Sequence, residues 1–118
     1  MKVVFYLKSC NTCTRIIKEL ELSNAFIFRE IKSTPITIEE LELIHDLSKS
    51  YESVFNRRAK LFHEKKLKDK NLTELEYKNY ILENYTLLKR PVIISNGEMF
   101  IGNSKKTIKE AKKHISEY

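Results

Sequence analysis

The stretch YLKSCNTCTR, residues 6–15, decides the fold. A short apolar run precedes it, and an amphipathic segment follows it at once. This pattern predicts a strand over residues 2–7, a polar turn, and a helix over about 11–22. The only two cysteines of the chain lie in this stretch with the spacing C-x-x-C, so that Cys10 comes just before the helix and Cys13 falls in its first turn.

The position of Cys10 favours a thiolate. The unpaired backbone N–H groups at a helix start and the positive end of the helix dipole both favour a negative charge on its sulfur. Such surroundings lower a thiol pKa from about 8.5 to roughly 7 or below. Cys10 is therefore the expected nucleophile, and Cys13, one turn on, is expected to resolve a covalent adduct by closing a disulfide. Asn11 and Thr12, between the two cysteines, are expected to shape the loop.

Length and composition indicate one small domain spanning residues 1–118. No run approaches the roughly 20 apolar residues of a membrane helix, and the N-terminal run is shorter than a signal peptide requires. A cytoplasmic location is therefore expected, where two cysteines are typically catalytic, redox-sensing or metal-bound. The net charge of +6 permits acidic partners without identifying one.

The rest of the chain divides into further elements. The apolar run at 25–31 reads as a second strand buried on both faces, as in a parallel sheet. Capping boxes at 37–40 and 73–76 each open a helix. Asn96 and Gly97 fit a two-residue hairpin turn, because both tolerate positive φ. The remaining expected elements are helical pieces within 51–70, strands at 91–95 and 98–101, and a last helix that Asn103 or Ser104 caps.

Some helical faces can be predicted as well. The helix that begins after Thr37 is expected to bury one apolar face, made of Ile38, Leu41, Ile44 and Leu47. The order is thus strand, helix, strand, a helical insert at about 37–86, then a hairpin and a helix. A C-x-x-C at the first strand–helix junction of such a chain predicts an α/β, thioredoxin-like fold with a four-stranded mixed sheet.

Three local motifs give the chain a resemblance to the arsenate reductase (ArsC)/Spx-like family. They are the Cys10 loop, the segment RAKLF that begins at Arg58, and the segment LLKRPVI at residues 87–93. Their order and spacing cover nearly the whole chain. The resemblance implies a thioredoxin fold with a helical insert, and it implies that the bond between Arg90 and Pro91 is cis.

The resemblance also implies an anion pocket beside the nucleophile. In the reductase branch, arginines surround the cysteine, and Arg58 and Arg90 fit two of those positions. A third arginine is expected after the last strand, where this chain has Gly102. We therefore expect weak or absent arsenate reduction, unless Lys105 or Lys8 fills the gap. Arg57 is an alternative to Arg58 as the inward-pointing residue.

Two functions follow from these residues and the resemblance. The first is a small thiol–disulfide oxidoreductase that acts on an oxyanion or a disulfide and is recycled by thioredoxin, glutaredoxin or glutathione. The second is an Spx-like redox-sensing regulator that binds RNA polymerase. Neither requires a bound cofactor.

Two other classes of site are not expected. His45, His63 and His114 show no paired spacing near the cysteines, so we expect no metal site. The basic run at 57–70 has Phe62 as its only aromatic residue, so we expect a solvated helix face there and no nucleic-acid surface.

Overall fold

The computed structural model describes residues 1–117. Its contacts divide the chain into two compact units. The first joins Met1–Thr34 to the part of the chain from Arg90 onward, and the second is Pro35–Lys89. The insert expected at about 37–86 lies within the second unit, and the expectation of one domain over the whole chain stays a prediction.

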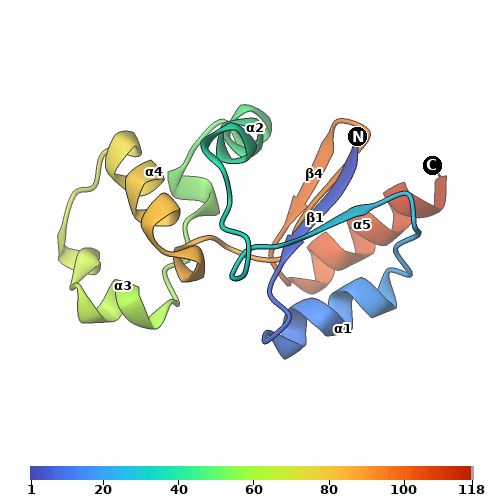
Figure 1. The fold of residues 1–118 in the computed structure, drawn as a ribbon, viewed down its shortest axis with the longest axis horizontal. Coiled ribbons are helices and arrows are strands. Elements are labelled where there is room, and N and C mark those ends of the chain that lie inside the picture. Colours follow the sequence, from blue (N-terminus) through green and yellow to red (C-terminus); the bar gives the residue numbers. More distant parts are fainter. Residues whose placement is uncertain (118) are drawn as a thin grey trace. The chain divides into compact units, whose positions relative to one another are not determined.

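The first unit is built on a four-stranded sheet with the order β2-β1-β3-β4 (Figure 1). β1 (Lys2–Tyr6) pairs in parallel with β2 (Ile27–Glu30) and antiparallel with β3 (Val92–Ser95). β3 then pairs antiparallel with β4 (Glu98–Ile101). This is the mixed sheet of the thioredoxin-like fold that the sequence predicts.

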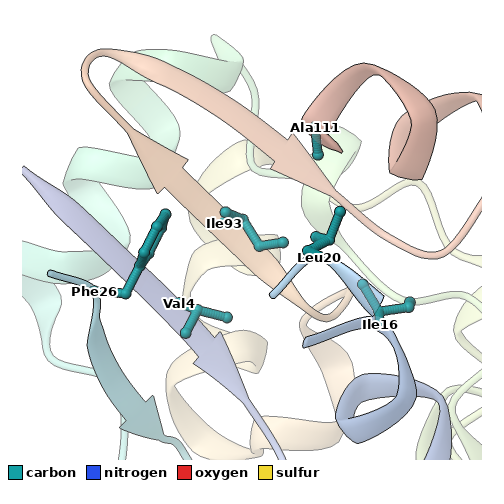
Figure 2. Packing of buried hydrophobic residues seen from close by; sticks show 6 residues of the cluster. All are labelled: Val4, Ile16, Leu20, Phe26, Ile93 and Ala111. Carbon is teal, nitrogen blue, oxygen red and sulfur yellow. The ribbon is translucent and has the colours of Figure 1, made fainter. Parts of the chain in front are cut away.

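Two helices cover one face of this sheet. α1 (Asn11–Glu19) and α5 (Lys105–Glu117) supply apolar side chains that pack with β1 and β3. Figure 2 shows these side chains gathered between the helices and the sheet. The buried cluster consists of Val4, Ile16, Leu20, Phe26, Ile93 and Ala111. Burying the larger of these side chains stabilises the fold by about 1.5–3 kcal/mol each, so this core holds α1 and α5 against the sheet.

The second strand is shorter and more exposed than its sequence indicates. β2 begins at Ile27 and lies at the edge of the sheet, with β1 as its neighbour. Ile27 and Phe28 are 60% and 43% exposed, so the expectation of burial on both faces is wrong. The apolar run correctly predicted a parallel strand, but an edge strand has a partner on one side only.

The ends of the first-unit elements are set by local backbone geometry. α1 ends at Glu19 and not near residue 22, because the chain turns at Glu21, whose φ is +51°. Asn96 and Gly97 both have positive φ, which confirms the predicted hairpin turn. Ser104 caps α5: its side-chain oxygen accepts a hydrogen bond from the Thr107 N–H at 3.1 Å.

The second unit consists of short helices. They are α2 (Ile38–Ser48), η1 (Glu52–Val54), α3 (Lys60–Glu64), η2 (Leu67–Asp69), α4 (Glu74–Glu83) and η3 (Tyr85–Leu87). Both predicted capping boxes are present, one at Thr37 and one at Thr73. The rings of Phe62 and Tyr77 pack edge-on against Phe55 at the centre of this unit.

The apolar face of α2 differs from the prediction at its first position. Leu41 and Ile44 are fully buried, but Ile38 is 51% exposed. Ile38 is the first residue of α2, so its side chain lies at the end of the buried face and not within it. Within residues 1–117, no helix has both the length and the apolar character that crossing a membrane requires.

Candidate active site at the start of helix α1

Cys10 is the residue at which the chain changes from turn to helix. It is the N-cap of α1, with φ −93° and ψ 106°, and its N–H donates to the Leu7 carbonyl at 3.2 Å. Its own carbonyl accepts the first helical hydrogen bond, from the Thr14 N–H at 3.1 Å. Cys10 is partly exposed, whereas Cys13 is fully buried. The more accessible sulfur therefore lies at the helix start, where the sequence predicted it.

The surroundings of Cys10 lower the pKa of its thiol. Partial burial is the largest single influence and would raise the pKa, but the Cys13 backbone amide and the Cys13 side chain oppose it, as do the positive charge of Arg90 and the Thr12 amide. Together these four interactions outweigh burial. The sulfur makes no conventional capping hydrogen bond, so the amides act on it at longer range.

Cys13 has the opposite tendency. The pKa of its thiol is raised to about 11, chiefly by burial and also by the hydrogen bond and negative charge of Cys10, against opposing effects from the Leu7 backbone and Arg90. At neutral pH Cys13 is therefore protonated while Cys10 is the readier to ionise. This division of roles matches a nucleophile and a resolving cysteine.

Arg90 and Pro91 lie where the chain enters β3. The peptide bond between them is cis, as the family resemblance implied. The Pro91 carbonyl accepts a hydrogen bond from the Gly102 N–H at 3.0 Å, which holds the residue after β4 beside the Arg90–Pro91 bond. Arg90 is the cation that acts on both cysteines. The structure thus brings together Cys10, Cys13 and Arg90, and Pro91 is joined to Arg90 by the cis bond.

Gly102, where the resemblance expects a third arginine, has a φ of +88°. This left-handed conformation suits glycine, since it strains any residue with a Cβ. No atom lies within 4 Å of the place where a Cβ would stand, so a Cβ there would meet backbone strain and no clash. Lys8 and Lys105 are exposed, and their part in filling the gap stays a prediction.

The arginines of the insert belong to the second unit. Arg57 is held within that unit: its Nη2 lies 2.8 Å from Glu52 Oε2 and 3.1 Å from the Tyr77 hydroxyl. Arg58 is exposed, and within residues 1–117 its guanidinium has no hydrogen bond or ion pair. Of the two, Arg58 is the one left available for an anion, and its role toward Cys10 stays a prediction.

The loop residues between the cysteines contribute through their backbones. The Asn11 carbonyl accepts a hydrogen bond from the Thr14 hydroxyl at 3.1 Å, and Asn11 itself is exposed. The Thr12 amide acts on the Cys10 sulfur. Among residues 1–117, no three histidine, cysteine or acidic side chains come together in a group that could hold a metal ion.

Sequence reasoning missed Glu30, the last residue of β2. Its carboxylate accepts hydrogen bonds from the Lys8 N–H at 3.0 Å and from the N–H groups of Lys32 and Ser33, at 3.0 and 2.8 Å. The Ser33 hydroxyl adds a fourth bond at 2.9 Å. Hydrogen bonds led by the one from the Ser33 amide lower the pKa of Glu30 to about 2, against a smaller effect of burial. The signal in the sequence was an acidic residue at the end of a strand that runs parallel to the cysteine strand.

Comparisons with known proteins find one family and several relatives that this chain is similar to. The family model described as the ArsC family matches residues 5–111. The global transcriptional regulator Spx of Streptococcus pneumoniae is 28% identical over 104 residues, which make up 86% of this chain and 78% of that protein. The global transcriptional regulator Spx 1 of Oceanobacillus iheyensis is 29% identical over 114 residues, or 92% of this chain and 85% of that protein.

Solved structures show the same architecture. An ArsC-family-related protein from Bacteroides fragilis has a TM-score of 0.77 at 25% identity, over 93% of this chain and 96% of that one. An arsenate reductase from Vibrio cholerae has a TM-score of 0.72 at 18% identity, over 95% of each chain. The second likeness concerns the fold alone.

Proposed function

The chain belongs to the ArsC family, and we propose that it is a thiol–disulfide oxidoreductase with Cys10 as nucleophile and Cys13 as resolving cysteine. The observation that carries this proposal is the difference in pKa between the two thiols. Cys10 lies at the start of α1 beside Arg90 with a lowered pKa, while the buried Cys13 has a pKa raised to about 11. A lowered pKa on the accessible thiol beside a cation, next to a buried and protonated second thiol, is the arrangement that a nucleophile and its resolving cysteine require.

With a disulfide substrate, the reaction has two steps. The Cys10 thiolate attacks one sulfur, forming a mixed disulfide and releasing the other sulfur as a thiolate that takes up a proton. Cys13 then loses its proton and attacks the Cys10 sulfur, which closes the Cys10–Cys13 disulfide and releases the second thiol. The substrate is reduced by two electrons, and the protein dithiol is oxidised by two.

The environment of Cys13 favours this order of events. The negative charge of Cys10 and its hydrogen bond are two of the influences that raise the pKa of Cys13. Both disappear once the Cys10 sulfur is covalently bound to substrate. Cys13 therefore becomes easier to deprotonate after the first step, when its attack is needed.

The proposal includes an external reductant and no bound cofactor. Thioredoxin, glutaredoxin or two molecules of glutathione would return the disulfide to the dithiol, in the cytoplasm. Arg90 would stabilise the thiolate and any anionic substrate, and Arg58 would be a second cation. A small oxyanion is the other substrate class, with Arg90 as its first charge-assisted partner.

A substrate panel with recycling coupled to NADPH tests the proposal. We expect the wild-type protein to turn over at least one disulfide or oxyanion, and Cys10→Ser to be inactive. Cys13→Ser should stop at the mixed disulfide, which mass spectrometry detects as an adduct on Cys10. Mild oxidation of the wild type should give a monomer that has lost two hydrogens. A covalent dimer as the main product would contradict the resolving role of Cys13.

A second candidate is a redox-controlled regulator that binds RNA polymerase. The observation that favours it is the similarity to proteins described as global transcriptional regulators, of which this chain covers 78% and 85%. In this case the same disulfide would change affinity for a partner protein. A regulator shows no turnover in the coupled assay, but its retention on immobilised RNA polymerase differs between the reduced and oxidised forms.

A further inference from the structure

We propose that Glu30 is a positioning residue, which fixes the cysteine loop by holding the Lys8 N–H at the end of β2. The inference rests on the proposed function in one respect, that Cys10 is the reacting group. Lys8 lies 22 residues from Glu30 in sequence, and their bond is 3.0 Å long. It connects the edge strand to the turn that ends in Cys10.

The carboxylate continues the hydrogen-bond ladder beyond the strands. The last backbone bond between β1 and β2 runs from the Ile31 N–H to the Tyr6 carbonyl, at 3.1 Å. In a parallel ladder, the next donor on β1 would meet a backbone carbonyl of its neighbour. Here the chain has already left β1, and the Lys8 N–H meets Glu30 Oε2 instead. The Glu30 side chain thus accepts one more hydrogen bond from the β1 side, at the point where the backbone of β2 turns away.

The two oxygens of Glu30 have different tasks. Oε1 accepts three hydrogen bonds from its own turn, from the Lys32 N–H, the Ser33 N–H and the Ser33 hydroxyl. Oε2 accepts from Lys8. The local bonds hold the carboxylate rigidly, so the remaining oxygen can position a distant segment. Only a carboxylate offers two acceptor oxygens in this geometry, since an amide has one.

The consequence for Cys10 passes through one short turn. The Cys10 N–H donates to the Leu7 carbonyl at 3.2 Å, so Lys8 is the second residue of the turn that Cys10 closes. Releasing Lys8 loosens this turn and moves the Cys10 sulfur relative to the Thr12 and Cys13 amides. Because those amides and Arg90 keep the pKa of Cys10 low, we expect the thiolate to become less favourable.

A direct charge effect would have the opposite sign. Considered only as a negative charge, Glu30 disfavours a nearby thiolate, and its removal would lower the pKa of Cys10. Considered as a positioning group, its removal raises that pKa. The direction of the change in Cys10 pKa therefore distinguishes the two roles.

The test compares Glu30→Gln with the matched control Ser33→Ala, both made in the Cys13→Ser protein. Glutamine can keep its oxygen on the local turn, but it then turns an NH₂ group toward the Lys8 N–H. Ser33→Ala removes one local bond and leaves the Lys8–Glu30 bond in place. We measure amide hydrogen exchange at Lys8, the apparent pKa of Cys10 from thiolate absorbance, and the fold by circular dichroism.

For Glu30→Gln we expect Lys8 exchange to become faster by roughly tenfold or more, and the Cys10 pKa to rise. Ser33→Ala should leave the Lys8 exchange rate and the Cys10 pKa close to their values in the Cys13→Ser protein. Unchanged Lys8 exchange, or a fall in the Cys10 pKa, in a folded Glu30→Gln protein would overturn the proposal. If Glu30→Gln does not fold, Glu30→Asp decides, because it keeps the charge but withdraws the oxygens by one methylene and should also speed Lys8 exchange.

These readouts need no substrate, so they separate this inference from the proposed function. If Cys10 of the Cys13→Ser parent titrates like a free thiol, the proposed function fails, while Lys8 exchange still reports on Glu30. If the pKa of Cys10 is low and the rate of amide exchange at Lys8 is the same in the Glu30→Gln protein, the proposed function stands and the positioning role is wrong.

Discussion

At the scale of single residues, Arg90 is the cation that most directly favours the Cys10 thiolate. It is the charged group among the influences that lower the pKa of Cys10. We therefore expect Arg90→Ala to raise that pKa and to slow alkylation at neutral pH, measured by thiolate absorbance in the Cys13→Ser protein. Arg15→Ala is the matched control, because Arg15 is exposed on α1 and is not among those influences. A Cys10 pKa at or above about 8.5 in the Cys13→Ser protein that keeps Arg90 would contradict the assignment of Cys10.

The raised pKa of Cys13 makes the free energy of unfolding depend on pH in the alkaline range. Its pKa is raised in the folded protein from an ordinary 9.0 to about 11, chiefly by burial. The folded state thus retains a proton that the unfolded state releases, so the stabilisation is complete below about pH 9 and is lost as the pH rises to about 11. The loss is on the order of 3 kcal/mol.

Urea unfolding of the reduced protein checks this prediction. The free energies of wild type and Cys13→Ala are compared at several pH values from neutral to about 11. Tyrosine and lysine titrations are common to both proteins and cancel. The stability advantage of the wild type should shrink as the pH rises. An advantage that stays constant over this range would show that Cys13 is not shifted.

At the scale of elements, the capping box of α2 can be tested alone. The Thr37 hydroxyl accepts from the Glu40 N–H at 3.1 Å, and Glu40 Oε1 accepts from the Thr37 N–H at 2.9 Å. We expect Thr37→Ala to lower the free energy of unfolding by about 1 kcal/mol, measured in urea. Thr34→Ala, at an exposed position outside the helix, should cost little. Equal losses in the two variants would mean that the cap contributes nothing specific.

At the scale of the whole molecule, the residue after β4 bears on the choice of substrate. We expect weak arsenate reduction, because glycine at position 102 gives the anion one positively charged partner fewer than an arginine would. Losing one charge-assisted contact costs about 1.5–3 kcal/mol, or roughly ten- to a hundredfold in binding. Gly102→Arg would supply the charge, but its φ of +88° adds a strain of roughly 1–2 kcal/mol to the fold.

Gly102→Ala is the matched control, since it carries the same strain without the charge. We expect arsenate kcat/KM for Gly102→Arg to exceed that of Gly102→Ala by roughly tenfold, and both variants to melt below the wild type. If the wild type turns over arsenate efficiently and Arg90→Ala does so equally well, the anion site lies elsewhere. In that case Lys8 or Lys105 becomes the candidate cation.

The sequence by itself determined the features that depend on neighbouring residues. The C-x-x-C at the start of α1, both capping boxes and the Asn96–Gly97 turn follow from spacing and local conformational preference. With the motif at Arg90, these were enough to predict the mixed sheet and the two cysteines of the site.

Tertiary structure decided what depends on residues far apart in the chain. The exposure of Ile27 and Phe28 follows from the edge position of β2, which the strand's own residues do not encode. The split in pKa between Cys10 and Cys13 requires the burial of one sulfur and the approach of Arg90. The bond between Glu30 and Lys8 forms only because β1 and β2 pair in parallel and end together, which brings residues 22 positions apart within 3.0 Å.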